Sequence, residues 1–252
     1  MASKIISVDE GSPAARAGLA AGETLLQIDG TAIRDVLDYK FYSYDARLTL
    51  KVLEQDGETV REVRVRKREG EPLGLNFEHY LMDQMKQCSN KCVFCFIDQL
   101  PKGMRKTLYV KDDDARMSFL MGNYISMTNL SEADVDRILR MHISPVNISV
   151  QTTNPELRVK MLQNRHAGEA LKIMDRFAEG GITMNCQLVV CKGLNDGKEL
   201  KRSLNDLKKL YPAVNTISVV PFGMTRHREG LYPLEPTDKP AGTRHPSGLV
   251  RG

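Results

Sequence analysis

Three closely spaced cysteines are the residues of this sequence best suited to chemistry. Cys88, Cys92 and Cys95 stand in the run Cys-Ser-Asn-Lys-Cys-Val-Phe-Cys, a C-x3-C-x2-C spacing. On a short loop this spacing lets three soft thiolates point at one centre, which suits an iron–sulfur cluster with one open iron, or a zinc ion. The chain has 5 cysteines, an odd number with three clustered, so metal or redox use in a reducing compartment fits better than a disulfide framework.

Zinc is the alternative interpretation of the same loop. A four-coordinate zinc site needs a fourth ligand, for which His79, Cys186 and Cys191 are the candidates. Structural zinc sites usually pair two C-x2-C knuckles, whereas Cys186 and Cys191 flank a predicted strand and, along it, would point to opposite faces. The spacing therefore favours a cluster over zinc.

Composition and charge narrow the class of protein. The 252 residues are 41% apolar and 27% charged, which is typical of a globular protein. Neither a secretory leader nor a run of 18 apolar residues is visible, so we expect a cytoplasmic protein without a membrane span. Residues 1–87 hold 12 basic and 15 acidic side chains, and residues 88–252 hold 24 and 17. Because the basic residues alternate with acids on helical stretches, we do not expect nucleic-acid binding.

Residues 1–80 are expected to form a small β-rich domain. Residues 48–52 and 63–66 alternate apolar and polar side chains in the strand period, and Gln55-Asp56-Gly57-Glu58 between them is typical of a hairpin turn. A short helix is expected from Pro13 to Ala17, followed by Gly18.

Residues 81–236 are expected to form a second domain in which strands and helices alternate, as in a parallel sheet or barrel. The predicted strands are 117–120, 124–127, 146–150, 184–190 and 216–220, and the predicted helices are 131–141, a stretch from Pro155, 167–179 and 196–210. Functional loops in such folds follow the strands at their C-terminal ends. The acids Asp112 to Asp114 could bind a cation or a positively charged substrate, but acids on a loop are usually only solvated, which is what we expect here. Residues 237–252 have a disordered composition.

The stretch from Gly11 to Gly30 resembles the middle of a PDZ domain. That resemblance implies binding of an extended peptide C-terminus beside a strand, with loop N–H groups meeting the terminal carboxylate. The loop normally comes earlier in the sequence, but here Pro72-Leu73-Gly74-Leu75-Asn76-Phe77 resembles it, which implies a permuted domain with Leu73, Gly74 and Leu75 at the peptide carboxylate. Alternatively, Leu73, Leu75 and Phe77 are only core-facing residues of a final strand.

In its βα setting, Cys88-x3-Cys92-x2-Phe94-Cys95 resembles the defining loop of the radical S-adenosylmethionine (SAM) superfamily. The resemblance implies a partial (β/α) barrel in which the three cysteines bind a [4Fe-4S] cluster and SAM chelates the open iron. It also implies reductive cleavage of SAM, with an electron donor such as a flavodoxin or ferredoxin. The substrate is not implied.

The resemblance also implies further cofactor-binding residues. Phe94 is expected against the cofactor, Gly122 and Asn123 are the nearest candidates for a Gly-Gly-Glu run that is missing here, and Ser149 and Gln151 are candidate polar contacts. Asn195 lies in a loop expected near the adenine. Ordinary explanations are open for several of them, because Ser149 and Gln151 would also fill a strand end, and a turn with an N-cap would explain the Asn195 loop.

The whole order of segments resembles bacterial PDZ-containing radical SAM proteins, which normally continue into a C-terminal domain of unknown function. We therefore expect an iron–sulfur radical SAM enzyme with a PDZ-like peptide-binding module. The alternative is a non-catalytic PDZ scaffold with a structural zinc or a vestigial cluster site.

Overall fold

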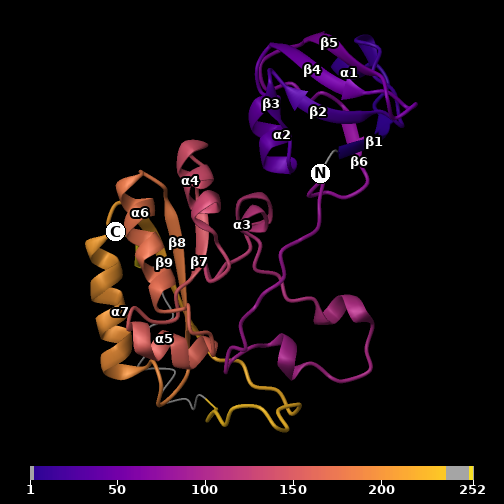
Figure 1. Ribbon diagram of the computed structural model, residues 1–252. Helices are drawn as coiled ribbons and strands as arrows, with labels where there is room; N and C mark the ends of the chain where they lie inside the picture. The colour runs from indigo at the N-terminus through magenta and orange to yellow at the C-terminus, as the bar shows by residue number, and fades with distance from the viewer. Residues whose placement is uncertain (1–2, 237–249, 252) are drawn as a thin grey trace. The chain divides into compact units, whose positions relative to one another are not determined.

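The chain folds into two compact units that divide between Met85 and Lys86 in a computed structural model, which describes residues 3–236 and 250–251 (Figure 1). Within these ranges every helix is too short or too polar to cross a lipid bilayer.

The first unit is built on a six-stranded sheet. The strand order is β5-β4-β2-β1-β6, with β3 paired to β2. The strands are β1 (Ser3–Val8), β2 (Thr24–Ile28), β3 (Thr31–Ala32), β4 (Arg47–Leu53), β5 (Val60–Arg66) and β6 (Leu75–Phe77). Every second residue of β4, from Leu48 to Val52, is buried, and β5 pairs with it antiparallel, with Leu50 opposite Val63. The alternating pattern thus correctly predicted this hairpin, because one face of it covers the core.

Two short helices complete the first unit, α1 (Pro13–Arg16) and α2 (Val36–Tyr42). The helix α1 was predicted, and Ser12 begins it by accepting the N–H of Ala15. The helix α2 was not predicted. Asp35 begins it, since its carboxylate accepts the N–H groups of Leu37 and Asp38.

The second unit contains a four-stranded sheet in the order β10-β9-β8-β7. Its strands are β7 (Val146–Ser149), β8 (Met184–Val190), β9 (Val214–Pro221) and β10 (Val250–Arg251). The first three are parallel, β10 is antiparallel, and Ile125 adds an isolated parallel bridge to Ile148. The chain is therefore mixed α/β, and strands were correctly predicted at β7, β8 and β9. A partial barrel is not shown, because the parallel part has three strands in the described residues.

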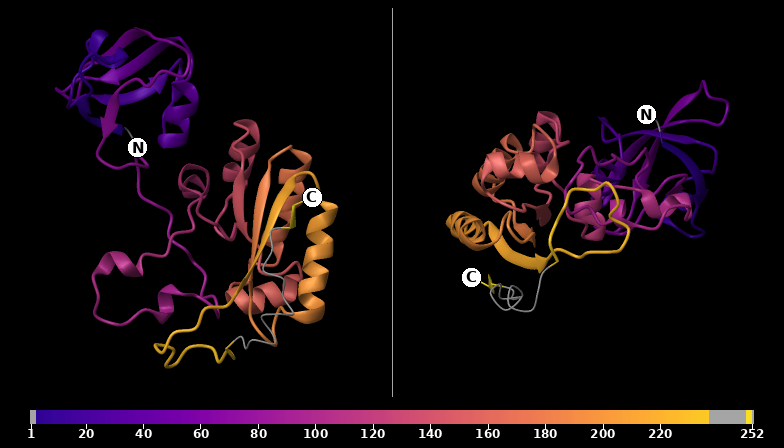
Figure 2. Two further views of the ribbon diagram at one scale, coloured as in Figure 1. Left: turned by 180° about the vertical axis from the view of Figure 1, so that it is seen from behind. Right: turned by 90° about the horizontal axis from the view of Figure 1, so that it is seen from below.

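Helices α6 and α7 lie along one side of this sheet, and the cysteine segment lies on the other (Figure 2). The helices are α3 (Ala115–Met121), α4 (Glu132–Arg140), α5 (Pro155–Leu162), α6 (Lys172–Glu179) and α7 (Gly197–Lys209), with 3-10 turns η1 (Ile97–Gln99), η2 (Lys106–Tyr109) and η3 (Glu169–Leu171). The predicted capping box begins α4, where Ser131 and Asp134 bond to each other's backbone N–H. A helix N-terminus set by such side chains can be read from local sequence.

The predicted strand at residues 117–120 is wrong, because these residues lie in α3. Asp114 begins this helix by accepting the N–H of Arg116, and Gly122 ends it with a left-handed backbone, φ 79°. A short apolar run has no periodicity that distinguishes a strand from a buried helical turn. The N-cap at Asp114 and the left-handed backbone at Gly122 mark the two ends of a helix here.

Candidate functional site

A cavity of about 670 Å³ lies in the second unit. Its walls include all three clustered cysteines, residues 122–124 before the Ile125 bridge, and side chains from β7, β8 and the end of β9. We call it the cysteine cavity. Its size is in the range of small-molecule and cofactor sites.

The cysteine loop is attached to the second unit through backbone hydrogen bonds. The N–H groups of Lys91 and Val93 donate to the carbonyls of Leu162 and Met161, at 3.0 and 2.9 Å. These two carbonyls belong to the last turn of α5, where helix carbonyls have no partner within the helix. The loop therefore supplies the missing donors for α5, and Val93 packs into the apolar cluster beside the same two residues.

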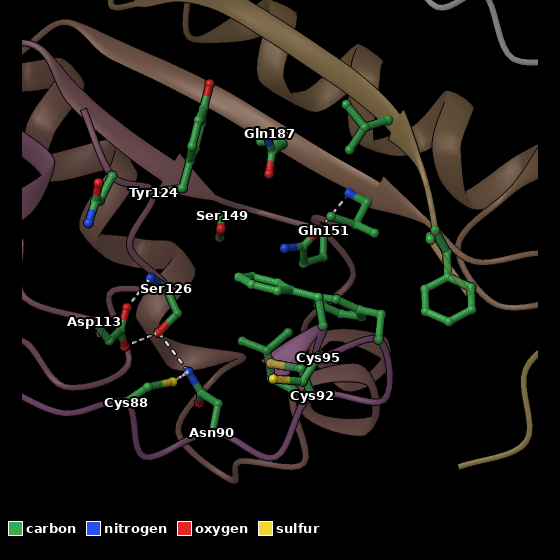
Figure 3. Close-up of a pocket in the computed structure, with 18 of the residues that line it drawn as sticks. Cys88, Asn90, Cys92, Cys95, Asp113, Tyr124, Ser126, Ser149, Gln151 and Gln187 are labelled. Atoms are coloured by element: carbon green, nitrogen blue, oxygen red, sulfur yellow. Dashed lines mark hydrogen bonds between the residues drawn. The ribbon is translucent and has the colours of Figure 1, made fainter. Parts of the chain in front are cut away.

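The three thiols face the same cavity. Cys92 and Cys95 lie side by side, and Cys88 lies apart from them beside Asn90 (Figure 3). Burial, together with the neighbouring Cys88 and Cys95, raises the pKa of Cys92 to about 12. Burial also raises the pKa of Cys88, while the backbone and side-chain N–H groups of Asn90 oppose that shift. Without a cation the loop thus favours the neutral thiols of Cys88 and Cys92, and a metal centre would have to displace their protons.

The donor set fits a [4Fe-4S] cluster held by three cysteines, since three thiols reach one cavity with room for a further ligand. The two buried cysteines that were candidates for a fourth zinc ligand do not reach this cavity. Cys186 and Cys191 are fully buried and are not among the cavity-lining residues. Within the described residues, no three or more His, Cys, Asp or Glu side chains are already gathered closely enough to hold a metal ion. The sulfurs would therefore have to move together on binding.

Five of the six predicted cofactor-binding residues line the cysteine cavity: Phe94, Gly122, Asn123, Ser149 and Gln151. The Ser149 and Gln151 side chains come from the end of β7 and point into the cavity (Figure 3). Gln151 uses its Oε1 to accept the N–H of Val189 at 2.6 Å, which leaves its Nε2 to meet a ligand. Asn123 donates to the carboxylate of Asp112 at 2.8 Å.

Asn195, the sixth predicted residue, does not line the cavity in the described structure. It is fully buried, and its amide donates to the carbonyls of Gln151 and Val189 and accepts the N–H of Cys191. The side chain therefore joins the ends of the β7 and β8 segments. Its contact with the site runs through Gln151.

The prediction that Asp112 to Asp114 are solvated is wrong for two of the three acids. Asp113 and Asp114 are 2% and 1% exposed. Asp113 accepts the backbone N–H and the hydroxyl of Ser126, at 2.6 and 2.5 Å, and burial raises its pKa despite these bonds. A run of three acids in the sequence does not reveal that two of them are buried. The partner of Asp113 is Ser126, which is distant in the sequence, and Asp114 pairs with Arg116 only because both lie at the start of α3.

Sequence reasoning also missed other polar side chains of the cavity, among them Asn90, Ser126 and Gln187. Tyr124, from the segment before the Ile125 bridge, and Gln187 both line the cavity (Figure 3). Gln187 stands on β8, where each second residue is half-buried, so the alternation along the predicted strand 184–190 could have indicated it as a candidate.

In the first unit, β6 lies at the edge of the sheet and forms the second half of the predicted carboxylate loop. Asp9 donates to the carbonyl of Gly74 at 2.9 Å, beside the paired residues Val8 and Leu75. Val8 and Leu75 therefore form a non-hydrogen-bonded pair of the antiparallel ladder. In such a pair the N–H of Leu75 points away from β1. Gly74 has φ 79°, a backbone that favours glycine.

The outward N–H of Leu75 already has a partner in the helix α2. It bonds to the hydroxyl of Tyr39, whose ring packs edge-on against Phe77 with centroids 5.1 Å apart. Burial raises the pKa of Tyr39 to about 12, against the effect of this bond. One of the three residues predicted to meet a peptide carboxylate is thus engaged by the chain itself, while Leu73 and Leu75 are buried as the alternative interpretation expected.

Fold and site together define a two-unit protein, in which a small β-sheet unit precedes an α/β unit with three cysteines on one cavity. Residues 67–217 match the family model of a Radical SAM-like domain, and residues 4–54 match that of a PDZ domain. Because the first match covers more than half of the chain, the chain belongs to the radical SAM-like family. The predicted combination of PDZ and radical SAM domains is confirmed.

Curated proteins and solved structures add little to these two family matches. No curated protein matches the chain. Among solved structures, the PDZ domain of an SdrC-like protein from Listeria innocua is 22% identical, covering 33% of this chain and 100% of its own, with a TM-score of 0.27.

Proposed function

We propose that this protein is an iron–sulfur enzyme of the radical SAM type that cleaves SAM reductively at a [4Fe-4S] cluster. The observation that carries the proposal is the meeting of Cys88, Cys92 and Cys95 on one cavity, in a chain of this family. When bound, the cluster and SAM would supply a carbon-centred radical that abstracts hydrogen from a substrate. The three thiolates would hold the cluster, and the short parallel sheet supports a partial barrel as its setting.

The residues of the cavity have separate tasks in this proposal. Ser149 offers a hydroxyl and Gln151 an amide N–H to the polar groups of SAM, and Asn195 holds Gln151 in place through its backbone. Phe94 and Phe222 cover the cavity with apolar rings, which keeps water from a reactive radical. Gly122 and Asn123 belong to the same wall.

The partners follow from the same reasoning. Cluster reduction requires a one-electron donor, for which a flavodoxin or ferredoxin is the proposed class. Free thiolate ligands are favoured in a reducing compartment, so the cytoplasm is the proposed location. The PDZ domain supports a peptide C-terminus as a further ligand, at Leu73, Gly74 and Leu75. At that site a ligand would compete with Tyr39 for the N–H of Leu75.

Anaerobic purification and reconstitution test the proposed enzyme. We expect a brown protein with about four irons and four sulfides per chain, which releases 5′-deoxyadenosine from SAM when dithionite is added. A colourless protein with stoichiometric zinc and no sulfide would overturn the proposal in favour of a PDZ scaffold. A triple Cys88, Cys92 and Cys95 to Ala variant, treated identically, gives the background for both measurements.

A further inference from the structure

Asn90 lies within the cysteine loop, two positions after Cys88, and its side chain is enclosed by polar groups. It is 5% exposed. Its amide nitrogen donates to the Ser126 hydroxyl at 2.8 Å and to the Cys88 Sγ at 3.5 Å, within the longer range of bonds to sulfur. These contacts are drawn in Figure 3. The two hydrogens of one NH₂ group are thereby both used.

The opposite end of the amide is held equally firmly. Its Oδ1 accepts the hydroxyl of Thr128 at 3.0 Å and the amide of Asn164 at 2.8 Å. A flipped amide would turn its oxygen toward the Cys88 sulfur and its NH₂ group toward the Asn164 donor. The four contacts therefore fix the nitrogen on the side of Cys88.

The direction of the Ser126 hydroxyl supports the same assignment. This hydroxyl donates its own hydrogen to the Asp113 carboxylate, so toward Asn90 it can only accept. The buried Asp113 thus orients Ser126, and Ser126 orients Asn90. The chain of bonds ends at a sulfur that is a proposed cluster ligand.

We infer that Asn90 is a positioning residue that orients Cys88 and raises the reduction potential of the cluster by donating an N–H bond to the ligand sulfur. This inference rests on the proposed function. A reduced cluster carries one more negative charge than an oxidised one, and an N–H dipole pointing at its sulfur stabilises the reduced form more. The backbone N–H of Asn90, which also bonds to Cys88, acts in the same direction. Loss of the side-chain bond should therefore make the potential more negative.

The test compares the midpoint potential of the reconstituted full chain, without SAM, in redox titrations followed by electron paramagnetic resonance. Asn90→Leu removes the donor and keeps the same number and branching of side-chain heavy atoms, and Asn90→Asp retains the shape and the bonds to Thr128 and Asn164. The matched control is Asn164→Leu, which removes a partner from the oxygen end of the same amide and leaves the bond to sulfur. Iron and sulfide content and circular dichroism are measured for each variant.

We expect both Asn90 variants to have a more negative midpoint potential than the parent, and Asn164→Leu to keep the parent value. A folded Asn90 variant that holds less iron than Asn164→Leu also supports the inference, because it shows that Cys88 is no longer oriented. Parent-like potential and full iron in both Asn90 variants would overturn it while leaving the proposed function intact. A parent chain that assembles no cluster would overturn both.

Discussion

The guanidinium of Arg158 donates to the carbonyl of Ser126 at 2.8 Å, across 32 positions of sequence. The same fully buried side chain donates to the carbonyls of Ser149, Val150 and Ala167. It thereby joins the chain beyond the Ile125 bridge, the end of β7 and the segment after α5. Burial lowers the pKa of Arg158 to about 10, and Asp113 opposes this shift, so the side chain is still charged at neutral pH.

Replacing this arginine should strongly destabilise the second unit. Arg158→Leu removes a buried charged donor from four carbonyls, of which that of Val150 also accepts the N–H of Thr152, and we expect a loss of about 3–5 kcal/mol in the free energy of unfolding. Arg158→Lys retains a charge with fewer donors, so its loss should be smaller. Urea unfolding followed by circular dichroism measures both. Arg202→Leu on α7, whose partner Asp206 is partly exposed, is the control and should cost less than about 1 kcal/mol. Equal losses for Arg158→Leu and Arg202→Leu would contradict the assigned role.

Replacing a cavity cysteine and replacing a core cysteine should have opposite effects on iron content. Cys92→Ala removes a thiol from the cavity, and we expect it to abolish cluster assembly because three ligands are the minimum for this site. Cys186→Ala removes a thiol from the core of β8, facing away from the cavity, and should retain the parent iron content. Iron and sulfide assays after identical reconstitution measure the difference. Full iron in Cys92→Ala, or its loss in a folded Cys186→Ala, would refute the ligand assignment.

Gly74 and Gly57 offer a matched pair in the first unit. Both have a left-handed backbone, with φ 79° and 75°. A Cβ at Gly57 meets nothing within 4 Å, whereas one at Gly74 would lie 2.3 Å from the Ser12 Cβ. We therefore expect Gly57→Ala to cost about 1 kcal/mol of stability, and Gly74→Ala about 2–4 kcal/mol. Thermal unfolding of the two variants and the parent measures these losses of stability. Equal losses would mean that the structure around Ser12 shifts enough to remove the close contact.

The hydroxyl of Tyr39 should protect a single backbone amide from exchange. Tyr39→Phe keeps the ring contact with Phe77 and removes the acceptor for the N–H of Leu75. A lost bond of about 1 kcal/mol corresponds to roughly fivefold faster hydrogen exchange at Leu75. Nuclear magnetic resonance measures this rate residue by residue. Tyr42→Phe on the same helix should leave the Leu75 rate unchanged, and an unchanged rate in Tyr39→Phe would show that the bond does not form in solution.

Asp114 should make the stability of the second unit depend on acid pH. Burial raises its pKa, but the guanidinium of Arg116 and the N–H of Lys86 outweigh burial, and the folded pKa lies below its usual value. Its contribution is then full above about pH 4 and is lost as the pH falls through the folded pKa. Asp114→Asn keeps the N-cap acceptor and removes the charge.

We therefore expect Asp114→Asn to be destabilised at pH 7, with a difference from the parent that shrinks toward pH 3. Urea unfolding at a series of pH values gives the comparison. A difference that stays constant with pH would mean that the ion pair with Arg116 does not contribute.

Some features of this protein follow from residues that are near one another in the sequence. The spacing of Cys88, Cys92 and Cys95 indicated the class of site, the alternation in β4 and β5 indicated a hairpin, and the capping box at Ser131 indicated the start of α4. Each of these depends on a period or a contact spanning a few residues. A single sequence displays such patterns directly.

Other features were decided only by tertiary structure. The burial of Asp113, the four carbonyls bound by Arg158, and the contacts of Asn90 with Ser126 and Asn164 join residues separated by up to 74 positions. Sequence analysis placed Arg158 only in a helical stretch and Asp113 only in solvent, because a polar side chain is stable in a core only when distant partners satisfy its hydrogen bonds. Which partners arrive depends on how the segments after the cysteine loop, around Ile125 and at the end of α5 pack together, and no local pattern encodes that.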